Sequence, residues 1–402
     1  MSGPPAGDGN RIAFGSQVTS WGQLALAGGP TPPDPAAVLA DDVETALRAV
    51  RHHVRYDTEL LVAALSRVDD QLRDQLLADG FGLSGAETTE PTREPEPGRL
   101  WILTSGTTGR PKRIAHTLTS LTTVRDTQPP RVWLCPYSPG TYAWWQLITL
   151  SLHQPGQDLV ITDPRRLDDW PLDAGEHGVT AVSGTPTFWR QSLYRHGELL
   201  SRLPLQQITL GGEPVDQSIL DVLSETFPAA RISWIYASSE VGAAIVVHDG
   251  RAGFPRSWLD RAVNGKVQLS VVDNELLVRS PHRGAGMDEW VHTGDRAEQN
   301  DDRVLITGRL AGDEINVGGS KVSAGAIRDL LLTHPAVRWA RVSGRRAPLV
   351  GQVVAAEIVT DGSLDGTALQ LWAADRLAEH AVPRRIRVLP DIPVKESLKS
   401  DV

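Results

Sequence analysis

The sequence predicts an α/β protein, with a large N-terminal domain of α/β sheets plus a barrel-like β subdomain, and a small α+β C-terminal domain. Its 402 residues suffice for two or three domains. After residue 100, short apolar runs alternate with amphipathic stretches, which is typical of parallel strands spaced by helices. From residue 267 the pattern changes to strands paired by turns. We expect the large domain at 1–309, a hinge at 310–313 and the small domain at 314–402.

The first hundred residues give fewer signals. Residues 1–40 are expected to form loops, because a cluster of Gly and Pro breaks regular structure. Helical spacing of apolar residues predicts one helix over 41–54 and another over 58–77. The Thr/Glu/Pro-rich stretch 87–98 is expected to be an exposed connector.

Short apolar runs in the middle of the chain predict strands of a largely parallel sheet. They are 132–134, 159–162, 179–183, 207–210 and 232–236. Between the last two runs we expect a helix over 217–227, for which Asp216 is a candidate N-cap.

Beyond residue 260 the chain predicts two strand pairs and then the small domain. The first pair spans 267–279 and turns at Asp273-Asn274, and the second pair is 290–295 with 304–307. For the small domain the sequence predicts, in order, a helix at 324–332, strands at 337–342 and 350–360, a helix at 366–380 and a strand at 384–388.

One stretch, between the apolar run 100–103 and an expected helix, points to chemistry. It reads Thr104, Ser105, Gly106, Thr107, Thr108, Gly109, Arg110, Pro111 and Lys112. Glycines let backbone N–H groups turn toward an anion, hydroxyls donate to phosphate oxygens, and a lysine adds positive charge. The stretch predicts a polyphosphate-binding loop. It is not a Walker loop, because that motif needs glycine directly before the lysine and Ser or Thr directly after it.

The same string resembles the signature loop of the adenylate-forming superfamily, which includes acyl-CoA synthetases, adenylation domains of peptide synthetases, and luciferases. The resemblance covers about residues 100–402. It implies a compact AMP-dependent acid ligase that uses ATP and Mg²⁺ to convert a small carboxylic acid into acyl-AMP and pyrophosphate. The acyl group then passes to a thiol, with CoA as the expected co-substrate. Thr104 to Lys112 would hold the β- and γ-phosphates.

Two segments resemble the family's adenine-binding parts. Gly211, Gly212, Glu213 and Pro214 resemble the segment whose backbone lies against adenine. The residues Tyr236, Ala237, Ser238, Ser239 and Glu240 resemble the Tyr-Gly-x-Thr-Glu motif. In that motif the tyrosine stacks on adenine, the hydroxyl contacts phosphate and the glutamate holds Mg²⁺. Ala237 and Ser239 replace the usual glycine and threonine, and Glu240 keeps the hard oxygen ligands that Mg²⁺ prefers.

Three more segments complete the resemblance. Asp295 follows Thr-Gly, as does the family's aspartate that accepts hydrogen bonds from both ribose hydroxyls. Arg309 would contact ribose or phosphate, and Asp313 would be the pivot of a mobile small domain, although the motif holds one extra residue. The tail after Pro393 resembles the catalytic lysine motif. Counting from that proline selects Lys399 for contact with the carboxylate and α-phosphate, with Lys395 as the competing candidate.

Aromatic residues and one glycine are the candidates for the acid pocket. They are Tyr142, Trp144, Trp145, Phe188 and Gly211, in a chain with twelve tryptophans. An aromatic or medium-sized apolar acid is therefore expected. The Pro-x-x-His segment that gates the acyl tunnel in many acyl-CoA synthetases reads Cys-Pro-Tyr-Ser at 135–138. Because no histidine stands there, the sequence does not predict how the tunnel closes.

The final acceptor stays open as well. A carrier-protein thiol, an amine, or nitrite in a diazo-forming natural-product pathway are alternatives to CoA, and an acyl carrier protein is a possible partner. A nucleotide-binding sensor without turnover is disfavoured by the retention of Lys112, Glu240, Asp295 and Arg309. A phosphotransferase is disfavoured because no second acidic metal ligand is evident.

Composition narrows the setting. The net charge of −9 argues against a nucleic-acid or anionic-membrane partner. No apolar run is long enough to span a bilayer, and the first ten residues lack the pattern of a signal peptide. The single cysteine, Cys135, fits a reducing compartment. We expect a cytoplasmic enzyme.

Overall fold

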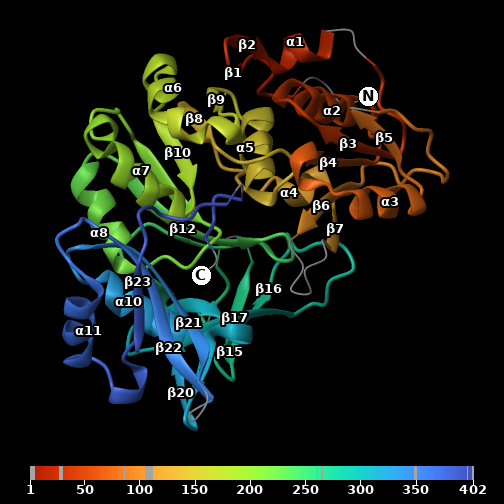
Figure 1. Ribbon diagram of the computed structural model, residues 1–402. Coiled ribbons are helices and arrows are strands. Elements are labelled where there is room, and N and C mark those ends of the chain that lie inside the picture. The colour runs from red at the N-terminus through yellow and green to blue at the C-terminus, as the bar shows by residue number, and fades with distance from the viewer. Residues whose placement is uncertain are drawn as a thin grey trace.

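Four sheets make up the part of the protein that the computed structural model describes, which is residues 5–26, 30–85, 87–104, 112–259, 261–263, 266–347, 351–395 and 397–400. Two sheets with parallel cores form the upper part of Figure 1. An antiparallel sheet lies below them, and the fourth sheet belongs to the C-terminal region in blue (Figure 1).

The largest sheet has the strand order β13-β12-β11-β10-β8-β9-β1-β2. Its strands are β1 (Arg11–Phe14), β2 (Gln17–Ser20), β8 (Arg131–Cys135), β9 (Gln157–Ile161), β10 (Ala181–Gly184), β11 (Gln207–Gly211), β12 (Arg231–Ser238) and β13 (Gly242–Val247). All neighbours from β1 to β12 pair in parallel, and the edge strands β2 and β13 are antiparallel. The carboxyl ends of β10, β11 and β12 therefore lie side by side at one edge of the sheet.

A second sheet, with the order β5-β3-β4-β6-β7, carries the ends of the signature loop. Its strands are β3 (Ala36–Ala40), β4 (Leu60–Ala64), β5 (Gly82–Gly85), β6 (Leu100–Thr104) and β7 (Lys112–His116). β6 and β7 are antiparallel, and their register sets Thr104 opposite Lys112. The two ends of the loop are thus held together by a strand pair.

Helices connect these strands, as Figure 1 shows. They are α1 (Trp21–Leu26), α2 (Val43–Tyr56), α3 (Asp70–Ala78), α4 (Leu118–Leu121), α5 (Tyr142–His153), α6 (Trp170–His177), α7 (Pro186–Leu200) and α8 (Gln217–Thr226). Short 3-10 turns are η1 (Leu65–Arg67), η2 (Pro164–Asp169) and η3 (Arg256–Trp258). The largest buried side chains of this part include five tryptophans packed in one apolar core.

The antiparallel sheet has the order β14-β18-β17-β16-β15. Its strands are β14 (Phe254–Pro255), β15 (Gln268–Val272), β16 (Glu275–Arg279), β17 (Val291–Gln299) and β18 (Arg303–Arg309). The turn between β15 and β16 has positive φ at Asp273 and Asn274, as residues with short polar side chains tolerate. A one-turn segment, α9 (Leu310–Asp313), then leads into the C-terminal region.

The C-terminal region has its own core around the sheet β20-β19-β22-β21, with β23 added on β22. Its elements are β19 (Glu314–Val317), β20 (Ser320–Ser323), α10 (Ala324–Leu332), β21 (Val337–Ala347), β22 (Gly351–Thr360), α11 (Gly366–Ala374), η4 (Glu379–Ala381) and β23 (Arg385–Val388). The tail that follows β23 returns from this region to the larger sheets (Figure 1).

Most predicted elements beyond residue 130 are confirmed. The five apolar runs form β8 to β12, and Asp216 caps α8 by accepting from Ile219 N. The predicted helix 366–380 ends earlier, because α11 stops at Ala374. Residues 87–98 contain no helix or strand, as expected of a connector. No helix among the described residues is long and apolar enough to cross a membrane.

Three predictions before residue 130 are wrong. The stretch 1–40 is not all loop, since it contains β1, β2, α1 and β3. The stretch 58–77 is not one helix, because Leu60–Ala64 is a strand whose residues are all buried. An apolar run buried on both faces has no periodicity that separates strand from helix. The signature loop leads into strand β7 and not into a helix, because residues 112–116 pair with β6.

Candidate active site

Two strand ends carry the predicted adenine-binding and metal-binding residues. β11 ends at Gly211 and leads into Gly212 and Glu213, while β12 ends at Ser238 and leads into Ser239 and Glu240. In open α/β sheets, ligands bind outside the carboxyl ends of the parallel strands. The sheet therefore brings the predicted residues of both segments to one edge.

Tyr236, Asp295 and Arg309 form a hydrogen-bonded cluster beside this edge. The Tyr236 hydroxyl donates to Asp295 Oδ2, and Arg309 Nε lies 3.1 Å from Asp295 Oδ1. Asp295 and Arg309 face each other in the register of β17 and β18, and Arg309 also donates to the carbonyl of Thr293 at 2.7 Å. Burial raises the pKa of the Asp295 carboxyl, and the charge of Arg309 opposes that shift. Burial also raises the pKa of Tyr236, so its hydroxyl stays protonated.

The Ser239-Glu240 turn is tied to the strand that follows the signature loop. His116, the last residue of β7, places its Nε2 at 2.7 Å from the carbonyl of Ser239. Burial lowers the pKa of His116, which keeps the imidazole neutral. Ser239 Oγ lies 3.1 Å from Glu240 Oε2. The sequence did not single out His116, and its buried contact 123 residues away has no local signal.

Glu240 is the carboxylate that the turn after β12 offers to a cation. Among the described residues, no three His, Cys, Asp or Glu side chains gather in a group that could hold a metal ion. Glu240 keeps part of its surface accessible, and Glu240 contributes its charge to the surroundings of Asp295. One carboxylate plus substrate phosphates suits Mg²⁺, which rarely uses a cage made of protein alone. The residues present fit the predicted metal.

The tail brings Lys399 to the same strand edge. A Cβ on Gly212 would lie 3.2 Å from Lys399 Cε and 3.6 Å from its Nζ. The Lys399 residue keeps accessible surface, yet desolvation by its neighbours lowers the pKa of the ammonium. The charges of Glu213 and Asp295 act in the opposite direction on it. Lys395 is exposed, and its backbone N–H donates to the carbonyl of Lys399 at 2.9 Å.

Helix α7 supplies contacts that sequence reasoning missed. Thr185 is the N-cap of α7, and its Oγ1 also donates to the carbonyl of Leu398. Thr187 Oγ1 lies 3.0 Å from Ser400 Oγ. The Thr-Pro-Thr string is itself a helix-start signal, but nothing in it reveals a partner more than two hundred residues away.

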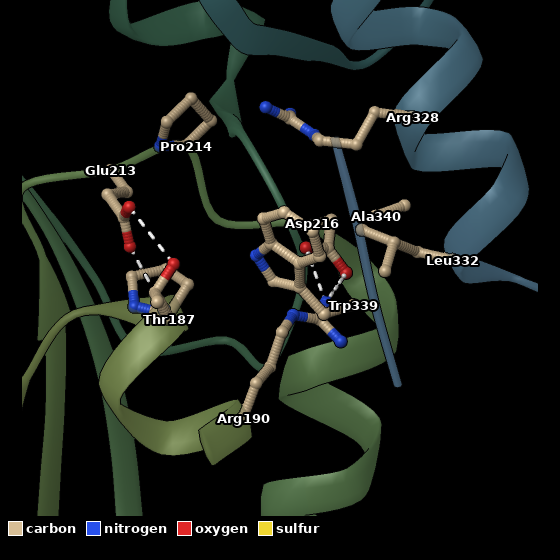
Figure 2. A pocket seen from close by; sticks show the side chains of 10 residues that line it. Thr187, Arg190, Glu213, Pro214, Asp216, Arg328, Leu332, Trp339 and Ala340 are labelled. Carbon is tan, nitrogen blue, oxygen red and sulfur yellow. Dashed lines mark hydrogen bonds and ion pairs between the residues drawn. The ribbon is translucent and has the colours of Figure 1, made fainter. Parts of the chain in front are cut away.

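A pocket lies where the large sheets meet the C-terminal region (Figure 2). Among the residues that line it are Thr187, Arg190, Glu213, Asp216, Arg328 and Trp339. Arg190 donates to both carboxylate oxygens of Asp216 at 2.7 Å, and Glu213 accepts from Thr187 (Figure 2). The pocket is thus walled by α7 and the turn after β11 on one side, and by α10 and β21 on the other.

Asp313, the predicted pivot, is bonded to the start of α10, and its Oδ2 also lies 3.8 Å from Nε of Arg296 in β17. Asp313 Oδ1 accepts from Gly325 N at 2.6 Å, and its Oδ2 accepts from Ser323 Oγ at 2.8 Å. Both partners belong to the start of α10. Just before Asp313, Ala311 has extended backbone angles and Gly312 has φ of 99°.

Of the predicted acid-pocket residues, Gly211 lies at the strand edge, where it ends β11. The aromatic ones lie further inside the protein. Trp144, Trp145 and Phe188 are at most 1% exposed and belong to the main core. The indole N–H groups of both tryptophans are buried without a hydrogen-bond partner among the described residues. Residues 105–111 of the signature loop lie outside the described residues, and Lys112 at its end is exposed.

Two family models match the chain: "AMP-binding enzyme" over residues 32–289, more than half of the chain, and "AMP-binding enzyme C-terminal domain" over 327–399. Among curated proteins, a 2-succinylbenzoate–CoA ligase of Bacillus cytotoxicus is 27% identical over 248 residues, which is 55% of this chain and 50% of that protein. The chain therefore spans about half the length of the curated relatives it matches.

Solved structures share the fold over nearly the whole chain. A variant of E. coli MenE with bound OSB-AMS superposes with a TM-score of 0.75 at 18% identity, covering 96% of this chain and 93% of that one. The amide bond synthetase McbA from Marinactinospora thermotolerans gives a TM-score of 0.69 at 20% identity, covering 98% and 96%. Likeness at these identities shows the shared fold alone.

Proposed function

Because the chain belongs to the family of AMP-binding enzymes, we propose that it activates a small carboxylic acid with ATP and then passes the acyl group to the thiol of CoA. The observation that carries the proposal is the approach of Lys399 to Gly212, beside the cluster of Tyr236, Asp295 and Arg309. Adenylate formation requires a positive charge beside the residues that bind the nucleotide.

In the first step a carboxylate oxygen of the acid attacks the α-phosphorus of ATP. The bond to the bridging oxygen breaks, and pyrophosphate leaves with its electron pair, so the products are acyl-AMP and pyrophosphate. Lys399 would lie between the carboxylate and the α-phosphate and neutralise the charge that grows there. No covalent enzyme intermediate is needed.

The strand-borne residues would bind the nucleotide. The ring of Tyr236 would stack on adenine, with the backbone of Gly211 to Pro214 on the other side. Asp295 would accept from the ribose hydroxyls, exchanging its bond from Tyr236 for those of the ligand, and Arg309 would contact ribose or phosphate. Residues 104–112 would hold the β- and γ-phosphates. Mg²⁺ held by Glu240 would neutralise phosphate charge, and Ser239 would donate its hydroxyl to phosphate.

In the second step the thiol attacks the acyl carbon and AMP leaves. We propose that the small C-terminal domain turns between the steps and withdraws Lys399. Asp313 is bonded to Ser323 and Gly325 and would travel with that domain. The turn would therefore occur at Ala311 and Gly312, directly before Asp313, where the motif holds its extra residue. Glycine adopts the positive φ found at Gly312 without strain.

The acid is proposed to be small and aromatic. The relatives act on 2-succinylbenzoate, an aromatic acid. In this chain the buried indole N–H groups of Trp144 and Trp145 lack partners among the described residues, and Tyr142 begins the same helix. Buried donors without partners are rare in folded proteins, so they suit a pocket that a ligand completes. Phe188 would form an apolar side of the acid pocket, and Gly211 would form a narrow side.

An amine is the alternative acceptor to the thiol. Attack by an amine on acyl-AMP would leave the first step unchanged and give an amide in place of a thioester.

The test is pyrophosphate release from Mg-ATP by the full chain, with a panel of aromatic and aliphatic acids plus nitrite. Each acid is offered alone, with CoA, with a pantetheinylated carrier protein and with a simple amine, and products are identified by mass. Acid-dependent pyrophosphate and AMP with a CoA ester are expected. An amide product would identify an amine as the acceptor in place of CoA, and a carrier-bound acyl group would identify the carrier-protein thiol. ADP as product, or nucleotide binding without pyrophosphate from any acid, would refute the proposal.

A further inference from the structure

The tail residues on both sides of Lys399 lie against helix α7. Leu398 and Ser400 are buried, as are Thr185 and Thr187 of the large domain that they contact. Ser400 Oγ also accepts from the indole N–H of Trp339 at 3.3 Å. The tail around Lys399 belongs to no helix or strand, so these side-chain contacts hold it in place of backbone pairing.

The carboxylate of Glu213 joins the two sides of this contact. Its Oε2 accepts from Thr187 N at 2.9 Å, and its Oε1 accepts from Thr187 Oγ1 and from Ser400 N, both at 3.0 Å (Figure 2 shows the bonds to Thr187). Thr187 N is one of the first N–H groups of α7, which find no acceptor within the helix. A negative charge is also favoured at the positive end of a helix.

We infer that Glu213 is a positioning residue that holds the tail, and with it Lys399, in the arrangement for adenylate formation. This inference rests on the proposed function and deepens it. The resemblance assigned to the Gly211–Pro214 segment only a backbone contact with adenine. The side chain of Glu213 instead faces α7 and Ser400, and its bond to Ser400 must break when Lys399 is withdrawn.

A carboxylate suits this place because it only accepts hydrogen bonds. Three donors converge on its two oxygens, and bonds to a charged acceptor are about twice as strong as neutral ones. A glutamine of the same size has one acceptor oxygen, and its NH₂ group would face a donor. Burial raises the pKa of the Glu213 carboxyl against the opposing hydrogen bonds and the charge of Lys399. The fold thus keeps an ionisable group where desolvation disfavours its charge, which is typical of functional positions.

The first measurement follows the tail directly and needs no substrate. Amide hydrogen exchange of the peptide that contains Leu398 and Ser400 is compared in the wild-type chain and in Glu213→Gln. We expect exchange in the variant to be faster by about tenfold or more, since a hydrogen bond to a charged acceptor is lost. Glu198→Gln is the matched control, because Glu198 lies exposed on α7, the helix that Glu213 contacts, and pairs with Arg202 away from the tail.

The second measurement separates the two half-reactions. Adenylate formation by Glu213→Gln is expected to fall by up to about 10²-fold, because a small displacement of Lys399 is costly. Transfer of the acyl group from supplied acyl-adenylate to the thiol is expected to stay near the wild-type rate. Ser400→Pro lacks the backbone N–H from which Glu213 accepts, and it also lacks the hydroxyl that contacts Thr187 and Trp339, so it should show the same split to at least the same degree. Adding Glu213→Gln to Ser400→Pro should cost little more, because the bond between the two residues is already lost.

The inference is overturned if Glu213→Gln leaves the tail exchange unchanged, or if both half-reactions fall alike. If the wild-type chain forms no adenylate from any acid, the proposed function fails, whereas the exchange measurement still decides whether Glu213 holds the tail. The two failures are therefore distinguishable.

Discussion

Asp295 and Lys399 lie within each other's electrostatic range, but the chain holds them there in different ways. Asp295 is part of β17, in register with Arg309 of β18 and bonded to Tyr236 of β12. Lys399 lies in a tail without regular structure, fixed by the side chains of Thr185, Thr187 and Glu213 through its neighbours.

This difference separates the residues that stay in place, which lie on strands, from the lysine that can be withdrawn, which lies in the tail. A strand residue cannot move without breaking the backbone ladder on both sides, whereas the tail is released by breaking a few hydrogen bonds and withdrawing the side chain of Leu398 from the main core. The proposed reaction needs the nucleotide site in both steps and the lysine charge in the first alone. The division between strands and tail matches that need, and selective damage to each region tests it.

The largest effect is expected for Lys399→Ala. Removing a charge aimed at the transition state costs about 10²–10³ in rate, so adenylate formation should fall by that factor. Transfer from supplied acyl-adenylate to the thiol should be affected far less. Pyrophosphate release and thioester formation are measured separately. Lys395→Ala, four residues earlier in the same tail, is the matched control. A loss in Lys395→Ala with an active Lys399→Ala would exchange the roles of the two lysines.

For Asp295→Ala we expect a smaller effect that is similar in both half-reactions. The ribose would lose its acceptor, and each bond to a charged group is worth about 1.5–3 kcal/mol. The KM for ATP should therefore rise about tenfold to a hundredfold, and use of supplied acyl-adenylate should weaken in parallel. Asp301→Ala, at the exposed turn between β17 and β18, serves as the control. An effect on adenylation alone would contradict the idea that strand-borne residues serve both steps.

The strand-borne half of the site could be predicted from the sequence because its signals are local. The runs that became β11 and β12 are apolar and are followed at once by Gly212 or Glu240, so order along the chain already put those residues at strand ends. The start of the chain was misread for the converse reason. Leu60–Ala64 is too short and too uniformly apolar to show a period.

The contact of the tail could not be predicted in this way. Glu213 and Ser400 are 187 positions apart, and Thr187 and Ser400 are 213 apart. Nothing in a Gly-Gly-Glu-Pro turn or in a Lys-Ser pair shows that one carboxylate will accept from both a helix start and a tail amide. Burial of Leu398 in the main core brings the tail to these groups, and no local propensity encodes that contact.

The pH dependence should differ between the steps. Adenylate formation needs protonated Lys399, and desolvation lowers the pKa of that ammonium below the usual lysine range. As pH rises through this lowered pKa the charge is lost, so kcat/KM for ATP in the first step should fall at a lower pH than an ordinary lysine would give, since kcat/KM reports the free enzyme. Lys399→Ala should lack this alkaline limb. A limb that persists in the variant would assign it to another group.

The smallest effect is expected at the rim of the tail contact. Arg195 of α7 pairs with Asp391 and Asp168, and its side chain is about one third exposed. Exposed pairs contribute at most about 1 kcal/mol, so Arg195→Ala should slow adenylate formation by less than about fivefold, and less still at high salt because mobile ions screen the pair. Arg202→Ala, which removes an exposed pair on the same helix away from the tail, is the control. A loss of adenylate formation in Arg195→Ala as large as that in Glu213→Gln would contradict the role of Glu213. The exposed ion pairs of Arg195 would then position the tail and Lys399, and the hydrogen bonds at the neighbours of Lys399 would not.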